Sequence, residues 1–181
     1  MIKILFVCHG NICRSPMAEF VMKKLVKDKG LASGFQIASA ATSTEELGNP
    51  VYPPARKKLA EHGISCAGKV ARQLTKQDYA EYDLLIGMDS ANIRNMEIIC
   101  HGDPEHKIHL LMEYAGSTRD VADPRYTRDF EATWQDVVAG CEGIKIQTQK
   151  PLSLGAMSKE ELDSALQKGL DDVKKGRVHT S

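Results

Sequence analysis

Hydrophobic residues are grouped in blocks along the chain, and the first block is nearly continuous. Residues Ile2–Val7 are apolar apart from one lysine, which is typical of a central parallel strand buried on both faces. Apolar side chains then recur every fourth residue from Met17 to Leu25, which predicts an amphipathic helix over Met17–Lys29. Ser15 is a fitting cap for the start of this helix.

The strand-like and helix-like patterns repeat over about the next 120 residues, as expected of a single domain. Apolar segments predict strands over Phe35–Ala41, Tyr82–Asp89 and Ile108–Met112. Helical spacing predicts helices over Ala55–His62, Ser90–Cys100 and Phe130–Gly143, with Ser90 as the cap of the second. Strands that alternate with helices predict an α/β fold, in which a four-stranded parallel sheet carries helices on both faces. Ligands bind beyond the carboxyl ends of the strands in such sheets, so we expect the functional site there.

The segment between the first predicted strand and the first helix carries the most specific chemical pattern. It begins with Cys8, and five residues separate this cysteine from Arg14. A loop between a strand and a helix presents backbone N–H groups and the positive end of the helix, which together bind a tetrahedral oxyanion. An arginine forks onto two oxygens of such an anion. The predicted phosphate-binding loop follows the first strand and comprises, with Cys8 and Arg14, the residues His9, Gly10, Asn11, Ile12, Cys13 and Ser15.

Cys8 is the candidate nucleophile of this loop. Positive surroundings favour the thiolate, which is the form that attacks phosphorus. A buried thiol at a strand end is the alternative, and it is favoured when Cys8 is considered alone. When Cys8 is considered together with the neighbouring loop residues, the interpretation as a nucleophile is favoured over a buried thiol. Asn11 tolerates a left-handed backbone that would shape the loop, and Ser15 is expected to hydrogen-bond the thiolate, to cap the helix, or both.

Transfer of a phosphoryl group to a cysteine also needs an acid that protonates the leaving oxygen. The pair Asp123-Pro124 follows the last predicted strand, and Pro124 biases Asp123 toward an extended backbone. An ordinary turn is the alternative, since Asp-Pro pairs are common in turns, and the residues alone favour it. Asp120 is the weaker competitor for the acid.

Several segments resemble a known enzyme family. The loop Cys8–Pro16 resembles the signature loop of the bacterial type of low-molecular-weight protein tyrosine phosphatase. Later segments are also similar to that family, namely Ser39–Ser43, His62–Ile64, Ala71–Leu74 and Asp83–Asp89. The resemblance implies a protein-tyrosine phosphatase that forms a cysteinyl-phosphate on Cys8. It also implies that the enzyme needs no metal and no other cofactor, and that it acts on phosphotyrosine-containing proteins.

The resemblance assigns individual roles as well. It makes Asp123 the general acid and base. It makes Cys13 the redox partner that bridges Cys8 under oxidation, although a small loop-filling residue is an equal alternative. Arg125 stands where the family often has an aromatic residue, so Tyr126 is the remaining ring of the substrate wall. Arg125 either favours acidic sequences near the phosphotyrosine or is simply solvated.

Other positions bear on how the loop is supported and on which substrate the protein uses, and they leave both questions open. Lys69 stands where many members carry a histidine that supports the loop asparagine. Ile12 stands where a related branch of protein-arginine phosphatases tends to carry threonine, which favours phosphotyrosine. A thiol-dependent arsenate reductase of the same fold would need a further cysteine pair, and Cys66 and Cys100 are far apart in sequence. A catalytically inactive phosphoprotein-binding module is a further alternative, and the intact loop argues against it.

Composition excludes other classes of function. The 181 residues carry 24 basic and 24 acidic side chains, which gives no general attraction to nucleic acid or to a membrane. No apolar stretch approaches the ~20 residues of a membrane span. The five cysteines form no zinc-type spacing, so no metal site is expected. An odd number of cysteines, one of them in a reactive loop, favours a reducing compartment and a cytoplasmic location.

The chain continues beyond the predicted phosphatase domain, which spans residues 1–144. Residues 145–157 are polar and contain proline and glycine, so they predict a linker. An apolar stripe predicts an amphipathic helical tail over residues 158–176, and it consists of Leu162, Leu166, Leu170 and Val173. The stripe either docks on the domain, which is slightly favoured, or binds a partner helix, or mediates self-association.

Overall fold

A single parallel sheet organises the protein. The computed structural model describes residues 1–148, so residues 149–157 of the predicted linker and the whole predicted tail (158–176) lie outside the described residues. The strands are β1 (Ile2–Cys8), β2 (Phe35–Ala41), β3 (Leu84–Gly87) and β4 (Ile108–Leu110), in the order β2-β1-β3-β4. Every pairing is parallel, which confirms the predicted four-stranded parallel sheet.

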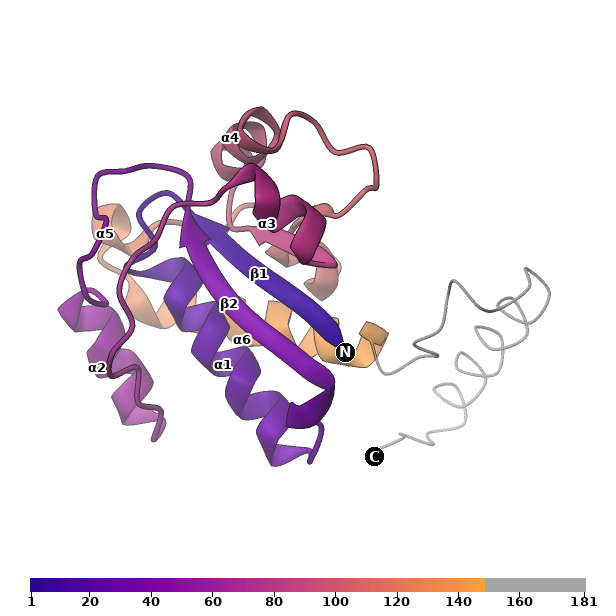
Figure 1. The fold of residues 1–181 in the computed structure, drawn as a ribbon. Coiled ribbons are helices and arrows are strands. Elements are labelled where there is room, and N and C mark those ends of the chain that lie inside the picture. The colour runs from indigo at the N-terminus through magenta and orange to yellow at the C-terminus, as the bar shows by residue number, and fades with distance from the viewer. Residues whose placement is uncertain (149–181) are drawn as a thin grey trace.

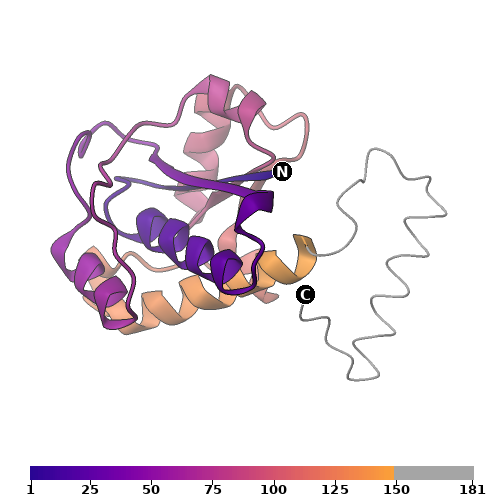
Figure 2. The same ribbon diagram turned by 60° about the horizontal axis from the view of Figure 1, so that its bottom comes forward.

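Helices cover both faces of the sheet, as predicted (Figure 1). The helices α1 (Arg14–Asp28), α2 (Pro53–Glu61) and α6 (Phe130–Thr148) lie on one face, and Figure 2 shows α1 and α6 side by side there. The helices α3 (Lys76–Glu81) and α4 (Ser90–Cys100) cover the other face. The remaining short elements are η1 (Ala32–Gly34), η2 (Leu111–Ala115) and α5 (Pro124–Thr127).

The interior strand β1 contributes to two cores, one on each side of the sheet. Ile4 and Phe6 belong to the core that includes residues of α1 and α6, whereas Leu5 and Val7 belong to the core under α3 and α4. Successive side chains of a strand point to opposite faces, which explains the continuous apolar run. All four side chains are fully buried, each of which stabilises the fold by about 1.5–3 kcal/mol. The end of β1 is therefore fixed from both sides.

Two helix starts differ from the predicted ones. The helix α1 begins at Arg14, so Ser15 lies inside its first turn and does not cap it. Ser90 is the first residue of α4 rather than its cap. Asp89 takes that role, because its carboxylate accepts a hydrogen bond from the backbone N–H of Asn92 at 2.7 Å. Aspartate and serine are both good caps, so their order in the sequence does not reveal which one the loop geometry selects.

The other differences concern element lengths. The strands β3 and β4 are shorter than the predicted strands Tyr82–Asp89 and Ile108–Met112, because Asp89 caps α4 and the 3-10 helix η2 begins at Leu111. The helix α6 runs to Thr148 rather than to Gly143, and α2 begins at Pro53 rather than at Ala55. A Cβ atom on Gly143 would meet the carbonyl oxygen of Tyr114, so this glycine permits close packing against η2 and does not end the helix. The elements α3 and α5 have six and four residues, too few to produce a helical pattern in the sequence.

Candidate active site

The segment between β1 and α1 is a compact loop whose predicted nucleophile is buried. Cys8 ends β1 and Arg14 begins α1, and each residue is 3% exposed. Asn11 has a left-handed backbone with φ of 58°, as predicted. Its amide donates to the Ser15 hydroxyl at 2.8 Å, and this hydroxyl lies 3.0 Å from Cys8 Sγ. Because Ser15 Oγ already accepts from Asn11, its own hydrogen can be donated to the sulfur.

Arg14 is held in place by two groups from other loops. Its Nη1 donates to Asp89 Oδ2 at 2.7 Å and to the carbonyl oxygen of Val121 at 2.9 Å. Burial would lower the pKa of this guanidinium, but the negative charge at Cys8 and the bond to Asp89 raise the pKa above its usual value. Arg14 therefore stays cationic and points in a fixed direction beside the cysteine.

The structure separates the two candidate acids. Asp123 caps α5, where its Oδ1 accepts from the backbone N–H of Arg125 at 3.0 Å, and its Oδ2 lies 3.5 Å from Arg14 Nη2. Asp120 instead accepts hydrogen bonds from the backbone N–H and the hydroxyl of Ser90, both at 3.0 Å. Asp123 is thus the one of the two that is brought to the phosphate-binding loop.

A buried polar network supports the loop from below. Asn11 Nδ2 also donates to Ser39 Oγ at 2.9 Å, and Ser39 Oγ donates to Glu19 Oε1 at 2.6 Å. Lys69 Nζ lies 3.1 Å from the same Glu19 oxygen and donates to the Ser39 carbonyl at 3.1 Å. Burial lowers the pKa of Lys69, and the charge of Glu19 opposes this. The lysine therefore reaches the loop asparagine through Glu19 and Ser39.

Cys13 and Ile12 lie on the inner side of the loop. They are 3% and 5% exposed, respectively. Burial, together with the charges of Cys8 and Asp123, raises the pKa of the Cys13 thiol far above its usual value. All five cysteines of the chain are free thiols in this structure. Cys13 therefore remains a neutral thiol in the reduced protein.

Charged side chains lie at the mouth of the loop. His9 Nε2 lies 2.9 Å from Glu45 Oε2, and the Arg125 guanidinium pairs with Glu46. Tyr126, the predicted second member of the substrate wall, is 85% exposed. Glu45 and Glu46 both reach the mouth from the loop between β2 and α2.

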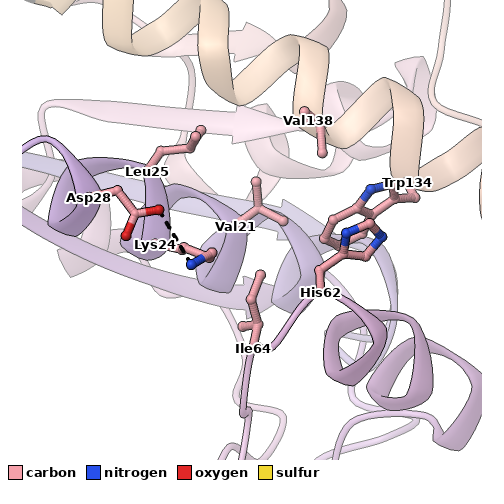
Figure 3. A pocket seen from close by; sticks show the side chains of 8 residues that line it. All are labelled: Val21, Lys24, Leu25, Asp28, His62, Ile64, Trp134 and Val138. Atoms are coloured by element: carbon pink, nitrogen blue, oxygen red, sulfur yellow. Dashed lines mark ion pairs between the residues drawn. The ribbon is translucent and has the colours of Figure 1, made fainter.

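A separate pocket of about 250 Å³ lies between α1 and α6 (Figure 3). The indole of Trp134 stacks on His62 there, with ring centroids 4.1 Å apart. None of the predicted site residues lines this pocket. In residues 1–148 we find no group of three or more His, Cys, Asp or Glu side chains arranged for a metal ion, and no helix able to span a bilayer.

Comparison with known proteins assigns the family. A family model described as low molecular weight phosphotyrosine protein phosphatase matches residues 3–154. This chain belongs to that family. It is 38% identical to the low molecular weight protein-tyrosine-phosphatase YfkJ of Bacillus subtilis over 156 residues, which cover 85% of this chain and 100% of the relative. It is 40% identical to the human low molecular weight phosphotyrosine protein phosphatase over 146 residues, 78% of this chain and 92% of that one.

Solved structures of phosphatases have the same fold. The crystal structure of YfkJ from Bacillus subtilis superposes with a TM-score of 0.80 at 38% identity, covering 83% of this chain and 96% of that chain. The crystal structure of a drosophila arginine phosphatase superposes with a TM-score of 0.74 at 28% identity, covering 83% and 99%. The fold and the enzyme class of this phosphatase agree with those expected from the sequence.

Sequence reasoning missed the residues that hold this phosphatase's loop from outside. Asp89 lies two residues beyond the end of β3, and an acidic residue near the carboxyl end of a parallel strand was an available signal. Glu19 gave no comparable signal. Lys23 follows four residues later and pairs with it, a spacing that is typical of exposed helix surfaces, yet Glu19 is only 3% exposed.

Proposed function

We propose that this phosphatase hydrolyses phosphotyrosine in protein substrates through a cysteinyl-phosphate on Cys8. The observation that carries the proposal is a convergence of distant segments. Arg14 closes the loop that Cys8 opens, and Asp123 Oδ2, more than a hundred residues later, lies 3.5 Å from Arg14 Nη2. A nucleophile, a fixed cation and an acid then surround one position where phosphorus can sit.

In the first step, the Cys8 thiolate forms a bond to phosphorus while the bond from phosphorus to the tyrosyl oxygen breaks. Asp123 gives its proton to that oxygen, so tyrosine leaves neutral. Because Nη1 of Arg14 is held by Asp89, we assign its Nε and Nη2 to two of the phosphate oxygens. The loop N–H groups, including those of Gly10 and Ile12, bind the remaining charge.

In the second step, Asp123 takes a proton from water, and the water oxygen bonds to phosphorus as the bond to sulfur breaks. The products are inorganic phosphate and the Cys8 thiolate. The Ser15 hydroxyl, 3.0 Å from Cys8 Sγ, donates a hydrogen bond that stabilises the departing thiolate. Asp123 is then protonated again and ready for the next substrate.

Other loop residues receive supporting roles in this proposal. His9 and the wall residues Arg125 and Tyr126 contact the substrate outside the phosphate. Cys13 is the redox partner that forms a disulfide with Cys8 when an oxidant is present, which protects the nucleophile from irreversible oxidation. Such reversible chemistry needs thiols that are normally reduced, which fits a cytoplasmic location.

Two alternative reactions compete with phosphotyrosine hydrolysis, and the structure bears on each. Phosphoarginine is the second candidate, because a drosophila arginine phosphatase has the same fold. Isoleucine at position 12 presents an apolar side chain and supports the aryl substrate instead. Arsenate reduction needs a neighbouring cysteine relay, and Cys66 and Cys100 lie in the two cores on opposite faces of the sheet.

The test compares peptides that carry phosphotyrosine, phosphoserine or phosphoarginine, with para-nitrophenyl phosphate as the simple aryl ester. We expect the highest kcat/KM on phosphotyrosine, and a loss of at least about 1,000-fold in Cys8→Ser. The phosphate is neutralised by Arg14 and the loop, so EDTA should leave the rate unchanged. Higher kcat/KM on phosphoarginine, or arsenate turnover with thioredoxin, would replace the proposal with the corresponding alternative.

A further inference from the structure

A side chain from the loop between β2 and α2 and one from α5 meet at the phosphate-binding loop. A Cβ atom on Gly10 would lie 3.2 Å from Cγ of Glu46 and 3.6 Å from Nη1 of Arg125. Contacts of 3.0–3.4 Å are tighter than most real Cβ contacts, so the missing side chain of Gly10 is what leaves room for this approach. Arg125 thus lies directly beside the phosphate-binding loop.

The guanidinium of Arg125 is held in place by its neighbours, but its hydrogen-bonding capacity is not fully used within residues 1–148. Its Nη2 faces Glu46 Oε1 at 3.8 Å, and its Cζ lies 6.0 Å from the ring centroid of Tyr52. The other oxygen of Glu46 accepts a hydrogen bond from Asn49 Nδ2 at 2.6 Å, so Glu46 keeps a partner when Arg125 shifts. An ion pair this long between half-buried groups contributes at most about 1 kcal/mol. Within residues 1–148, no hydrogen bond from Arg125 Nη1 to a protein acceptor is found.

The neighbouring negative charges do not cancel the positive electrostatic field of Arg125 at the phosphate-binding loop. The nearby carboxylate of Glu45 is paired with His9 at 2.9 Å. Burial is the main cause of the raised pKa of Cys13, and the positive charges of Arg14 and Arg125 both act to lower that pKa. The field of Arg125 therefore reaches the interior of the loop as well as the mouth, where it is 32% exposed.

We infer that Arg125 makes this phosphatase prefer phosphotyrosine sites that carry an acidic side chain next to the phosphotyrosine. In this inference, which rests on the proposed phosphotyrosine activity, a substrate carboxylate binds the parallel N–H groups of Nη1 and Nη2 of Arg125, while Nη2 also stays beside Glu46. The planar fork of an arginine suits this arrangement, since it bonds a carboxylate with two parallel N–H groups.

The test uses three phosphotyrosine peptides that differ only in the flanking residues, which are glutamate, glutamine or lysine. The wild-type protein should show kcat/KM about 5-fold higher for the glutamate peptide than for the glutamine peptide, and lowest for the lysine peptide. The preference should shrink as salt concentration rises, because the contact is partly exposed. Equal kcat/KM for all three peptides would overturn the inference and leave the proposed function intact.

Variants then assign the preference to Arg125. Arg125→Gln should bring the ratio for glutamate over glutamine to about one, and Arg125→Glu should favour the lysine peptide. Glu46→Gln should increase the ratio, because it removes a competing negative charge. Arg128→Gln changes an exposed arginine of the same segment and should keep the wild-type ratio. Thermal unfolding shows that each variant is folded, and the ratio of kcat/KM between peptides is unaffected by a rate change that is common to all of them.

The outcomes separate the two claims. A wild-type ratio retained in Arg125→Gln, or a ratio lowered by Glu46→Gln, would overturn the assignment to Arg125. Hydrolysis of para-nitrophenyl phosphate with none of the phosphotyrosine peptides would instead overturn the proposed function, and this inference with it.

Discussion

At the scale of single residues, the loop works through short contacts among side chains that the sequence places near one another. Ser15 Oγ lies 3.0 Å from Cys8 Sγ, and Asn11 donates to the same hydroxyl at 2.8 Å. The spacing of Cys8 and Ser15 predicted the first contact, whereas the hydrogen bond from Asn11 to Ser15 was not predicted. The bond from Arg14 to Asp89 was not predictable in this way, because it joins residues from two strand ends that only the fold brings together.

The prediction at the scale of single residues concerns Lys69, which supports the loop through Glu19 and Ser39. Lys69→Met should lower kcat on para-nitrophenyl phosphate about 10-fold, because Glu19 loses a partner and the Ser39–Asn11 contact loosens. The free energy of unfolding should fall by about 2 kcal/mol, since a buried carboxylate keeps only part of its pairing. Steady-state kinetics and urea unfolding measure the two effects.

The control for Lys69 is Lys24, whose pair with Asp28 at 3.3 Å lies on the surface of α1. Lys24→Met should change neither quantity measurably. Lys69→Arg keeps the positive charge and should recover part of the lost kcat. Wild-type kcat in Lys69→Met would show that this network does not position the loop.

At the scale of elements, apolar runs like that of β1 and apolar residues at every fourth position, as in α1, were sufficient to predict the four strands and the longer helices, but not α3 and α5. The end of α6 was not. Gly143 reads as a stop signal in the sequence, whereas in the structure it is a contact point where the backbone of η2 approaches the helix. A glycine that ends a helix and a glycine that admits a neighbour look the same without the tertiary contact.

Gly143→Ala therefore tests which role this glycine has. A Cβ atom there would collide with the carbonyl oxygen of Tyr114, which cannot move aside as a flexible side chain would. We expect a loss of about 2 kcal/mol in the free energy of unfolding, despite the better helix propensity of alanine. Gly34→Ala, where a Cβ atom meets nothing within 4 Å, should be neutral or stabilising by about 0.5 kcal/mol. Equal effects in the two variants would show that the close packing of α6 on η2 is unimportant.

At the scale of the whole molecule, the site depends on segments spread from β1 to α5, and the family match extends over residues 3–154. We propose that the predicted tail over residues 158–176 is not needed for catalysis. A chain that ends after residue 154 should keep kcat on para-nitrophenyl phosphate within about 2-fold of the full chain. A larger loss would mean that the tail contributes to the site.

The same pair of proteins distinguishes the expected roles of the tail. Docking on the domain predicts a monomer in both cases and a lower Tm for the shortened chain, since a docked stripe of leucines buries apolar surface. Light scattering and thermal unfolding measure the two quantities. A larger mass for the full chain alone would favour self-association instead.

The measurement that tests the catalytic account most directly is the trapping of phosphate on Cys8. Asp123→Asn should slow the attack of water, so that rapid quenching of a reaction with a radiolabelled phosphotyrosine peptide captures the intermediate. We expect mass spectrometry to find one phosphate on the peptide that contains Cys8, and none in the corresponding Cys8→Ser protein. Turnover of the labelled substrate without any phosphate on Cys8 would contradict the account.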